Sequence, residues 1–399
     1  MPELLPFAGL RFRTDVAGPL SQLTCPPYDV ITTAQRHQLL DRSPYNVVRV
    51  ELPDGDYAGA ARYLAEWQRS SILDQEAAEA LYGYRMTYLS SNGERRSTLG
   101  VVGALALEPP GEGILPHEQT TPKAKTDRLE LLRATHANTS PIWCLCSQVG
   151  LARAIGAIPS TGVATSTDEA GNEHQLWPIT DRAVQAAVGA VVAAGPLLVA
   201  DGHHRYETAL AFQAEQGATS TATVAAVRAG HGADAVMALV VELSEQQLEV
   251  RAIHRVVTGA SSGEAVLRAF AGDYELAPAP GIGPDILAAM VARGALAVVT
   301  ASGTYLAQPR PGSAAEGLAL DSTRADTVLA GVANAELAYE HDPDAAVGAV
   351  RSGRAEAALL CRPATVAQIA ATGRGGLRMP PKTTFFWPKP LTGMVLRAW

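Results

Sequence analysis

The stretch PLLVADGHHRYETALAF, residues 196–212, decides how this chain is expected to fold. Four apolar residues, Leu197 to Ala200, predict a short buried strand, and a helical pattern follows as far as Gly217. A strand that ends in a glycine-containing turn and leads into a helix favours anion binding. The first N–H groups of the helix lack an intrahelical acceptor, and the helix dipole adds partial positive charge there. Between the two elements lie Asp201, Gly202, His203, His204 and Arg205.

The side chains of this turn suit phosphate chemistry. A guanidinium such as that of Arg205 can grip two phosphate oxygens. His203 and His204 can donate hydrogen bonds or transfer protons near neutral pH. Asp201, at the end of the strand, could orient a histidine, hold a hydroxyl or bind Mg²⁺. The alternative is that Asp201 caps the helix and the histidines are surface residues, but so many polar groups in one turn favour a functional site.

A second polar cluster is LPHEQTTPKAKTDRLELL, residues 115–132, which precedes a helix expected to start near Thr126. Glu118, next to His117, could act as a general base or could be an ordinary loop carboxylate. The pair does not form the HExxH zinc motif, because no second histidine follows at the required spacing. Arg128 lies in the predicted helix.

Three shorter segments add charged or aromatic groups. CPPYDVI (25–31) carries Tyr28 and Asp29, and IHRVV (253–257) carries His254 and Arg255. PPKTTFFWPKP (380–390) carries Lys382 and Lys389, although its aromatic residues could simply dock a terminal segment. Together these segments indicate one site for an anion, assembled from distant parts of the chain. We expect Gly202, Arg205, Tyr206, Lys382, Lys389, His254 and Arg255 to bind phosphate or nucleotide, and Tyr28, Asp29, His117 and Arg128 to bind substrate.

Composition narrows the class of protein. With 47% hydrophobic and 18% charged residues, the chain can bury a large core. Its net charge of −8 and its lack of a basic run argue against nucleic acid as a partner. The cysteines are expected to be buried thiols of a reducing compartment, with Cys144 and Cys146 on one face of a strand. Neither a signal peptide nor a membrane span is expected, so we expect a cytoplasmic protein.

The order of predicted elements favours an α/β (α+β) fold with several domains. Residues 141–275 alternate strands and helices around the turn, flanked by α+β regions at 1–140 and 276–399, unless the whole chain forms one unit. A hairpin is expected around Asn92-Gly93. NVVRVELP (46–53) predicts a strand, and residues 324–340 predict one helix.

Five ordered motifs give the chain a family resemblance. CPPYDVI, PHEQT…PK…DRLELL, ADGHHRYETAL, IHRVV and MPPKTTFFWPKPLTG resemble a widespread microbial family designated domain of unknown function 1015. The motifs run from the first thirty residues to the last twenty, so the resemblance covers nearly the whole chain. The family designation implies no activity.

The central turn resembles that of the ParB/sulfiredoxin-like fold, which includes free L-serine kinases. This resemblance implies a ParB/sulfiredoxin-like core and phosphoryl transfer between ADP or ATP and serine with Mg²⁺. It implies catalytic or phosphate-contacting roles for Asp201, His203, His204 and Arg205, with Asp201 as the candidate Mg²⁺ ligand. The kinases' catalytic carboxylate lies upstream of the turn, and Glu118 is the candidate for it here.

Several functions compete at this point. The first is a phosphotransferase for serine, phosphoserine or a similar small hydroxylated metabolite. The second is a nucleotide-binding ParB-like regulator, and the third is a phosphoester hydrolase. Sulfiredoxin-like chemistry needs a cysteine in the turn, which has none, and no Walker A motif is present. A small-molecule substrate and a nucleotide are the expected partners, with neither nucleic acid nor membrane, and a homodimer is left open.

Overall fold

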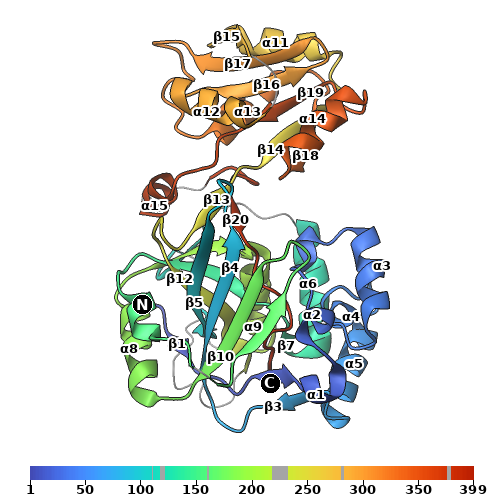
Figure 1. The fold of residues 1–399 in the computed structure, drawn as a ribbon, viewed down its shortest axis with the longest axis vertical. Helices are drawn as coiled ribbons and strands as arrows, with labels where there is room; N and C mark the ends of the chain where they lie inside the picture. Colours follow the sequence, from blue (N-terminus) through green and yellow to red (C-terminus); the bar gives the residue numbers. More distant parts are fainter. Residues whose placement is uncertain (110, 117–121, 160, 218–231, 280–282, 375–378) are drawn as a thin grey trace. The chain divides into compact units, whose positions relative to one another are not determined.

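Two compact units make up the chain (Figure 1). The computed structural model describes residues 1–109, 111–116, 122–159, 161–217, 232–279, 283–374 and 379–399. Unit 1 comprises Met1–Glu249 with Pro388–Trp399, and unit 2 comprises Val250–Trp387. This division differs from the expected boundaries near residues 140 and 275, because strands from both sides of residue 140 share one sheet. The mixed α/β class with more than one domain is confirmed.

A nine-stranded sheet organises unit 1. β11, the strand before the polar turn, pairs in parallel with β6 and antiparallel with β8. Pro116 at the end of β6 lies opposite Val199, so both strands end at the same edge of the sheet. The order is β6 (Ile114–Pro116), β11 (Leu197–Asp201), β8 (Ile142–Cys146), β12 (Ala235–Glu242), β5 (Arg95–Ala106), β4 (Leu81–Leu89), β10 (Glu173–Ile179) and β9 (Ala164–Thr167), with β1 (Leu4–Leu5) also on β5.

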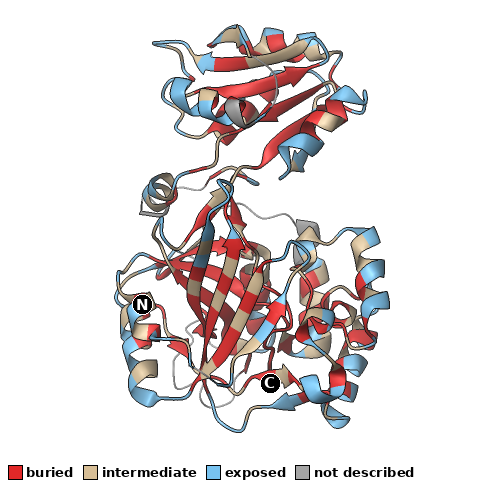
Figure 2. Cartoon of the chain, viewed as in Figure 1, coloured by how far each residue is buried: buried red, intermediate tan, exposed pale blue. Residues whose placement is uncertain are grey.

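Alternate residues of the central strands build the core of unit 1. Figure 2 shows these strands as the buried centre of the unit. Cys144 and Cys146 both enter this core from one face of β8 and are free thiols, as expected. The same core includes side chains of α7 (Leu151–Ile155), α8 (Arg182–Ala193) and α9 (His203–Glu215).

The expected hairpin is confirmed as β4 and β5. Gly93 adopts a φ of 81°, a left-handed conformation that glycine reaches without steric cost. The N-terminus of α8 is capped, since the Asp181 carboxylate accepts from the N–H groups of Ala183 and Val184.

The N-terminal segments of unit 1 are mostly helical. The expected strand at 46–53 is wrong: Val48–Glu51 forms the helix α4. Strand propensity of the valines is overruled by tertiary packing, because α4 packs against α5 and buries Val48, Val50 and Glu51. The other elements are α1 (Thr14–Ala17), α2 (Leu20–Leu23), a 3₁₀ turn (Tyr28–Val30), α3 (Thr33–Arg42), α5 (Tyr57–Arg69), α6 (Pro122–Thr135), and the pair β2 (Leu10–Phe12) with β3 (Leu73–Gln75).

The last twelve residues return to unit 1. Thr392 bridges to Cys25 and Leu396 to Leu10, and β21 (Arg397–Ala398) pairs with β7 (Ala137–Asn138). The buried guanidinium of Arg397 donates to the carbonyls of Ala235 and Gly232, at 3.0 and 2.8 Å. These contacts fix the C-terminal segment, and with it Lys389, to the unit that carries the turn.

Unit 2 is built on a six-stranded antiparallel sheet. The expected single helix at 324–340 is wrong, since α13 ends at Leu329 and β18 follows. The sheet order is β15 (Tyr274–Pro278), β17 (Gly303–Pro309), β16 (Leu296–Thr300), β19 (Ala357–Leu360), β14 (His254–Thr258) and β18 (Glu336–Glu340). Its helices are α11 (Gly263–Phe270), α12 (Pro284–Arg293), α13 (Asp321–Leu329), α14 (Pro343–Arg351) and α15 (Val366–Arg374), and β13 (Glu249–Arg251) pairs with β20 (Phe385–Trp387). Among the described residues, no helix has the length and apolar character needed to cross a membrane.

The sheet of unit 1 makes one stability prediction. Gly83 on β4 lies opposite Trp177 on β10, and a Cβ at Gly83 would come within 2.2 Å of the indole ring. We expect Gly83→Ala to lower the free energy of unfolding by about 1–3 kcal/mol, because the buried ring must move. Gly189→Ala in α8 is the matched control, since its Cβ would meet nothing within 4 Å. Denaturant unfolding of both variants tests this; equal effects would contradict it.

Candidate functional site

The turn joins a buried strand directly to a helix. Asp201 is the last residue of β11, Gly202 precedes the helix, and α9 begins at His203. Gly202 adopts a φ of 85°, and a Cβ there would lie 3.0 Å from Nη2 of Arg205. Glycine is therefore required both by the backbone conformation and by the close approach of the guanidinium. His203 is buried, and His204 is partly buried.

The Asp201 carboxylate lies between two cations. Lys389 Nζ donates to one carboxylate oxygen, and Arg205 Nη2 donates to the other at 3.0 Å. Both cationic side chains are largely buried, with 10% and 11% of their surface exposed. Burial alone would raise the pKa of Asp201, but the charges of Lys389 and Arg205 outweigh it and lower the pKa to about 2. The carboxylate is therefore ionised throughout the physiological range.

Arg205 connects this ion pair to the residues just before β8. Its Nη1 donates to the hydroxyl of Ser140 at 2.9 Å and to the carbonyl of Pro141 at 2.7 Å. Burial alone would lower the pKa of Arg205, whereas the carboxylates of Asp201 and Asp29 raise it. Its Nε is buried and has no acceptor among the described residues. One N–H of the guanidinium is thus available to a ligand oxygen.

A buried carboxylate, Glu51, extends the network. It accepts hydrogen bonds from Thr139 Oγ1 and, at 3.1 Å, from Ser140 Oγ. Arg128 Nη1 lies 3.9 Å from its Oε1 and donates to its backbone carbonyl at 2.7 Å. Sequence reasoning missed Glu51 because it placed the residue in a strand. The one available signal was an acidic residue next to a run of valines.

Tyr28 and Arg128 lie against each other in this network. The guanidinium carbon of Arg128 is 4.2 Å from the centre of the Tyr28 ring, a cation–π contact. Arg128 also pairs with Asp127, Nη2 to Oδ2 at 2.6 Å. Asp29 is exposed next to Tyr28, and its charge acts on Arg205. Within unit 1, the structure therefore brings the predicted residues Tyr28, Asp29, Arg128 and Lys389 together with the turn that contains Asp201 and Arg205.

The cavity inside this network is small. It has a volume of about 50 Å³ and is lined in part by Glu51, Arg128, Ser140 and Arg205. That space admits a group of a few atoms, such as water or part of a phosphate, and is far smaller than a nucleotide.

Tyr206 is not available as a phosphate ligand, which corrects the expectation for it. Its side chain is buried in the core of unit 1, and its hydroxyl donates to the carbonyl of Glu108 at 2.6 Å. Its backbone N–H is bonded to the carbonyl of Gly202 at 3.0 Å. Both donors of Tyr206 are thus used within the fold.

Three other predicted residues belong to unit 2. Arg255 is fully buried and pairs with Asp326, while its Nη1 donates to the carbonyls of Ile253 and Lys382. His254 is buried and its Nδ1 accepts from the N–H of Cys361, and burial lowers its pKa to about 4. These contacts make His254 and Arg255 core residues of unit 2, so we place neither at the phosphate site. Lys382 is exposed there, with a φ of 58°.

His117 and Glu118 lie outside the described residues. The preceding residue, Pro116, is opposite Val199, two residues before Asp201.

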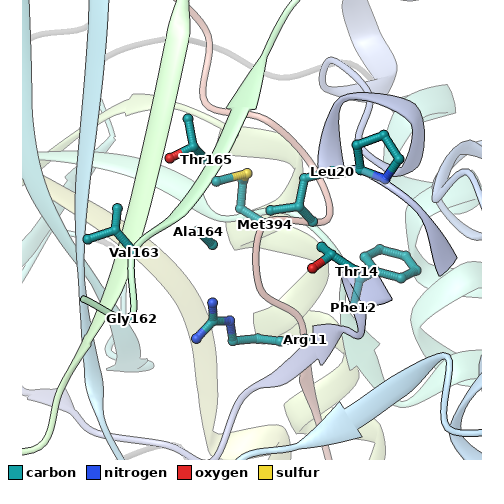
Figure 3. Close-up of a pocket in the computed structure, with 10 residues that line it drawn as sticks. Arg11, Phe12, Thr14, Leu20, Gly162, Val163, Ala164, Thr165 and Met394 are labelled. Carbon is teal, nitrogen blue, oxygen red and sulfur yellow. The ribbon is translucent and has the colours of Figure 1, made fainter. Parts of the chain in front are cut away.

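A larger groove lies elsewhere on unit 1 (Figure 3). It has a volume of about 700 Å³ and is lined by Arg11, Thr14, Thr165, Met394 and neighbouring residues. Among the described residues that line it, Arg11 alone is ionisable, and it pairs with Glu76 at 2.8 Å. Without an acid, a base or an unpaired cation, this groove offers no group for phosphate chemistry.

The described residues do not fit a resident metal ion at the turn. Both oxygens of Asp201 already accept from cations. Among the described residues, no three His, Cys, Asp or Glu side chains are grouped so that they could hold a metal. The expectation that Asp201 is a metal ligand therefore finds no support in its contacts.

The low pKa of Asp201 predicts how stability depends on pH. Its folded pKa, about 2, is below the ordinary value of 3.8, so the stabilisation is complete above pH 4 and is lost as the pH falls toward 2. We expect the difference in unfolding free energy between wild type and Asp201→Asn to be about 1 kcal/mol larger at pH 6 than at pH 3. Chemical denaturation at both pH values measures it; a difference that does not change with pH would contradict the assignment.

Comparison with known proteins gives a family but weak structural likenesses. Similar solved structures include a conserved hypothetical protein from Pyrococcus furiosus, at 15% identity and a TM-score of 0.37, covering 70% of this chain and 88% of that one. A free serine kinase mutant in complex with ADP matches at 15% identity and a TM-score of 0.38, with 70% and 90% coverage. SbnI with a C-terminal truncation, from Staphylococcus aureus, matches at 11% identity and a TM-score of 0.41, with 73% and 85% coverage.

At these TM-scores the likenesses assign no activity. No curated protein matches the chain in sequence. Residues 4–331, most of the chain, match the family described as protein of unknown function, DUF1015. Four of the five motifs lie in this range, and the fifth, residues 379–393, lies beyond it. The chain belongs to the DUF1015 family.

Proposed function

We propose that this protein is a phosphotransferase that moves a phosphoryl group between a nucleotide, ADP or ATP, and the hydroxyl of serine or a similar small metabolite. The observation that carries the proposal is the ion pair of Asp201 with Lys389 and Arg205 at the N-terminus of α9. Two cations and a helix N-terminus meet at one point, which suits an anionic group. The resemblance of the turn to that of free serine kinases supports the same reaction.

Each group has a distinct role in this proposal. Lys389, the Nε of Arg205 and the start of α9 hold the transferred phosphate and balance the charge that develops on it. Asp201 is a positioning residue, because it orients both cations and reduces their repulsion. His203 and His204, at the start of the helix, are the proposed hydrogen-bond donors to the phosphate oxygens.

Glu118 is the proposed general base. It accepts the proton of the attacking hydroxyl while that oxygen bonds to phosphorus and the nucleotide leaves. Support comes from the end of β6, since Pro116 lies beside Val199 at the edge of the sheet that carries Asp201. We propose that Tyr28, Asp29, His117 and Arg128 bind the small substrate, because Tyr28 and Arg128 already belong to the network of Arg205 and Glu51.

Magnesium enters this proposal only with the nucleotide. Mg²⁺ is commonly bound by substrate phosphates and waters with few protein ligands. Both carboxylate oxygens of Asp201 already accept hydrogen bonds from Lys389 and Arg205. We therefore assign no Mg²⁺ ligand to Asp201, and every step of the reaction is assigned to the protein's own residues. The expected Mg²⁺ is part of the nucleotide substrate.

The first functional prediction concerns charge at the turn. We expect wild type to transfer labelled phosphate from ADP or ATP to serine, or from phosphoserine in reverse, and Asp201→Asn to lower kcat by about 100- to 1,000-fold. Asp181→Asn is the matched control, because asparagine caps α8 as well as aspartate does. Release of inorganic phosphate without transfer would identify a hydrolase instead. Nucleotide binding without either product would identify a regulator.

The second functional prediction concerns the base. We expect Glu118→Gln to lower kcat by about 100- to 10,000-fold while nucleotide affinity stays within about threefold, because a base acts on the hydroxyl and not on the nucleotide. Single-turnover rates together with calorimetric binding of the nucleotide separate the two effects. Full activity in Glu118→Gln would remove this residue from the mechanism and leave the role of the turn intact.

A further inference from the structure

Unit 2 contains its own polar cavity. It has a volume of about 390 Å³ and lies where α13 begins, close to the end of β19 and the start of α15. This volume is in the range typical of sites for small molecules. The residues that matter to its chemistry are Asp321, Ser322, Arg324, Arg362 and Gln368.

The lining has a surplus of positive charge. It includes the three arginines Arg255, Arg324 and Arg362 and one carboxylate, Asp321. Arg362 forms a two-point contact with Asp321, Nε to Oδ2 at 2.9 Å and Nη2 to Oδ1 at 2.7 Å. Arg255 is balanced by Asp326. Arg324 must share Asp321 with Arg362, so one positive charge of the lining remains unbalanced.

Arg324 also has an unsatisfied donor. Arg324 is 8% exposed, and its Nη1 donates to Asp321 at 3.2 Å and to the carbonyl of Gly294 at 2.9 Å. Its Nε is buried and has no acceptor among the described residues. Leaving a buried charged donor without an acceptor is costly, so an acceptor is expected in the cavity that Arg324 lines.

The start of α13 adds donors to the same cavity. Leu320 precedes the helix, and no side chain of a described residue caps its N-terminus. The first N–H groups of a helix lack intrahelical acceptors and attract anions. Ser322 and Thr383 contribute hydroxyl groups, 2.9 Å apart, to the lining.

From these observations we infer that the cavity of unit 2 binds a small organic phosphate, held by Arg324, Arg362 and the N-terminus of α13. Phosphate offers more acceptor oxygens than a carboxylate does, which matches the number of donors. The cavity is also larger than a bare phosphate ion needs, so the ligand carries an organic part. This inference does not depend on the proposed activity of unit 1.

The test is calorimetric titration of the full chain with glycerol 3-phosphate, with glycerate as the carboxylate probe of similar size. We expect binding of the phosphate, weakened about 10- to 100-fold in Arg324→Gln. Arg354→Gln, at an exposed arginine of the same unit, is the control and should bind as wild type does. The titrations are repeated in an Arg205→Met background, which removes the proposed phosphate ligand of unit 1 and should leave this binding event unchanged.

A second variant tests the same inference if Arg324→Gln does not fold. Gln368 accepts from the N–H of Thr365 at the start of α15, and glutamate can replace it in that capping position. Nε2 of Gln368 also donates to the carbonyl of Ala319 in an exposed hydrogen bond that glutamate cannot make. Because that bond is solvent-exposed, Gln368→Glu should still fold, and it should weaken phosphate binding by adding negative charge to the lining. The inference is overturned if wild type binds no glycerol 3-phosphate or binds glycerate equally well. It is also overturned if Arg324→Gln and Gln368→Glu fold and bind glycerol 3-phosphate as tightly as wild type does.

Discussion

The buried carboxylate of Asp201 is the constraint on which the arrangement of unit 1 depends. An ionised carboxylate at this depth requires compensating charge, since burying it alone would cost several kcal/mol. The compensation comes from Arg205, four residues along the chain, and from Lys389, 188 residues away. The return of residues 388–399 to unit 1 is therefore tied to the chemistry of the turn as well as to packing.

Local sequence patterns were sufficient for the turn itself. The apolar run before Asp201, the glycine and the helical pattern after it specify β11, the turn and α9 almost residue by residue. The same holds for the hairpin at Gly93. In each case the residues that determine the structure are neighbours in sequence, so no knowledge of the tertiary fold is needed.

Patterns that depend on tertiary contacts misled the sequence interpretation. In a strand, Glu51 would share a face with Arg49, away from Val50, and would be expected to be exposed. In α4, Val50 and Glu51 lie on one face with Val47, the residue that precedes the helix, and all three are buried. The pairing of Arg255 with Asp326 likewise could not be inferred, because 71 residues separate them. A charged residue in a sequence motif can be a paired core residue as readily as a residue that binds a ligand.

The energetic cost of the network around Arg205 favours a functional origin. Replacing a buried ion pair by apolar side chains is often neutral or stabilising, so stability alone gives no reason to bury Glu51, Arg128, Asp201 and Arg205 together. The contrast with Arg255 is informative, because its guanidinium donates to Asp326 and to two carbonyls, whereas Arg205 keeps a buried Nε without an acceptor. Arg324 in unit 2 has the same incomplete bonding. The Nε of Arg49 also lacks an acceptor among the described residues, but Arg49 lines neither cavity. Arg205 and Arg324 each line one, and there the missing acceptor is most simply an anionic ligand.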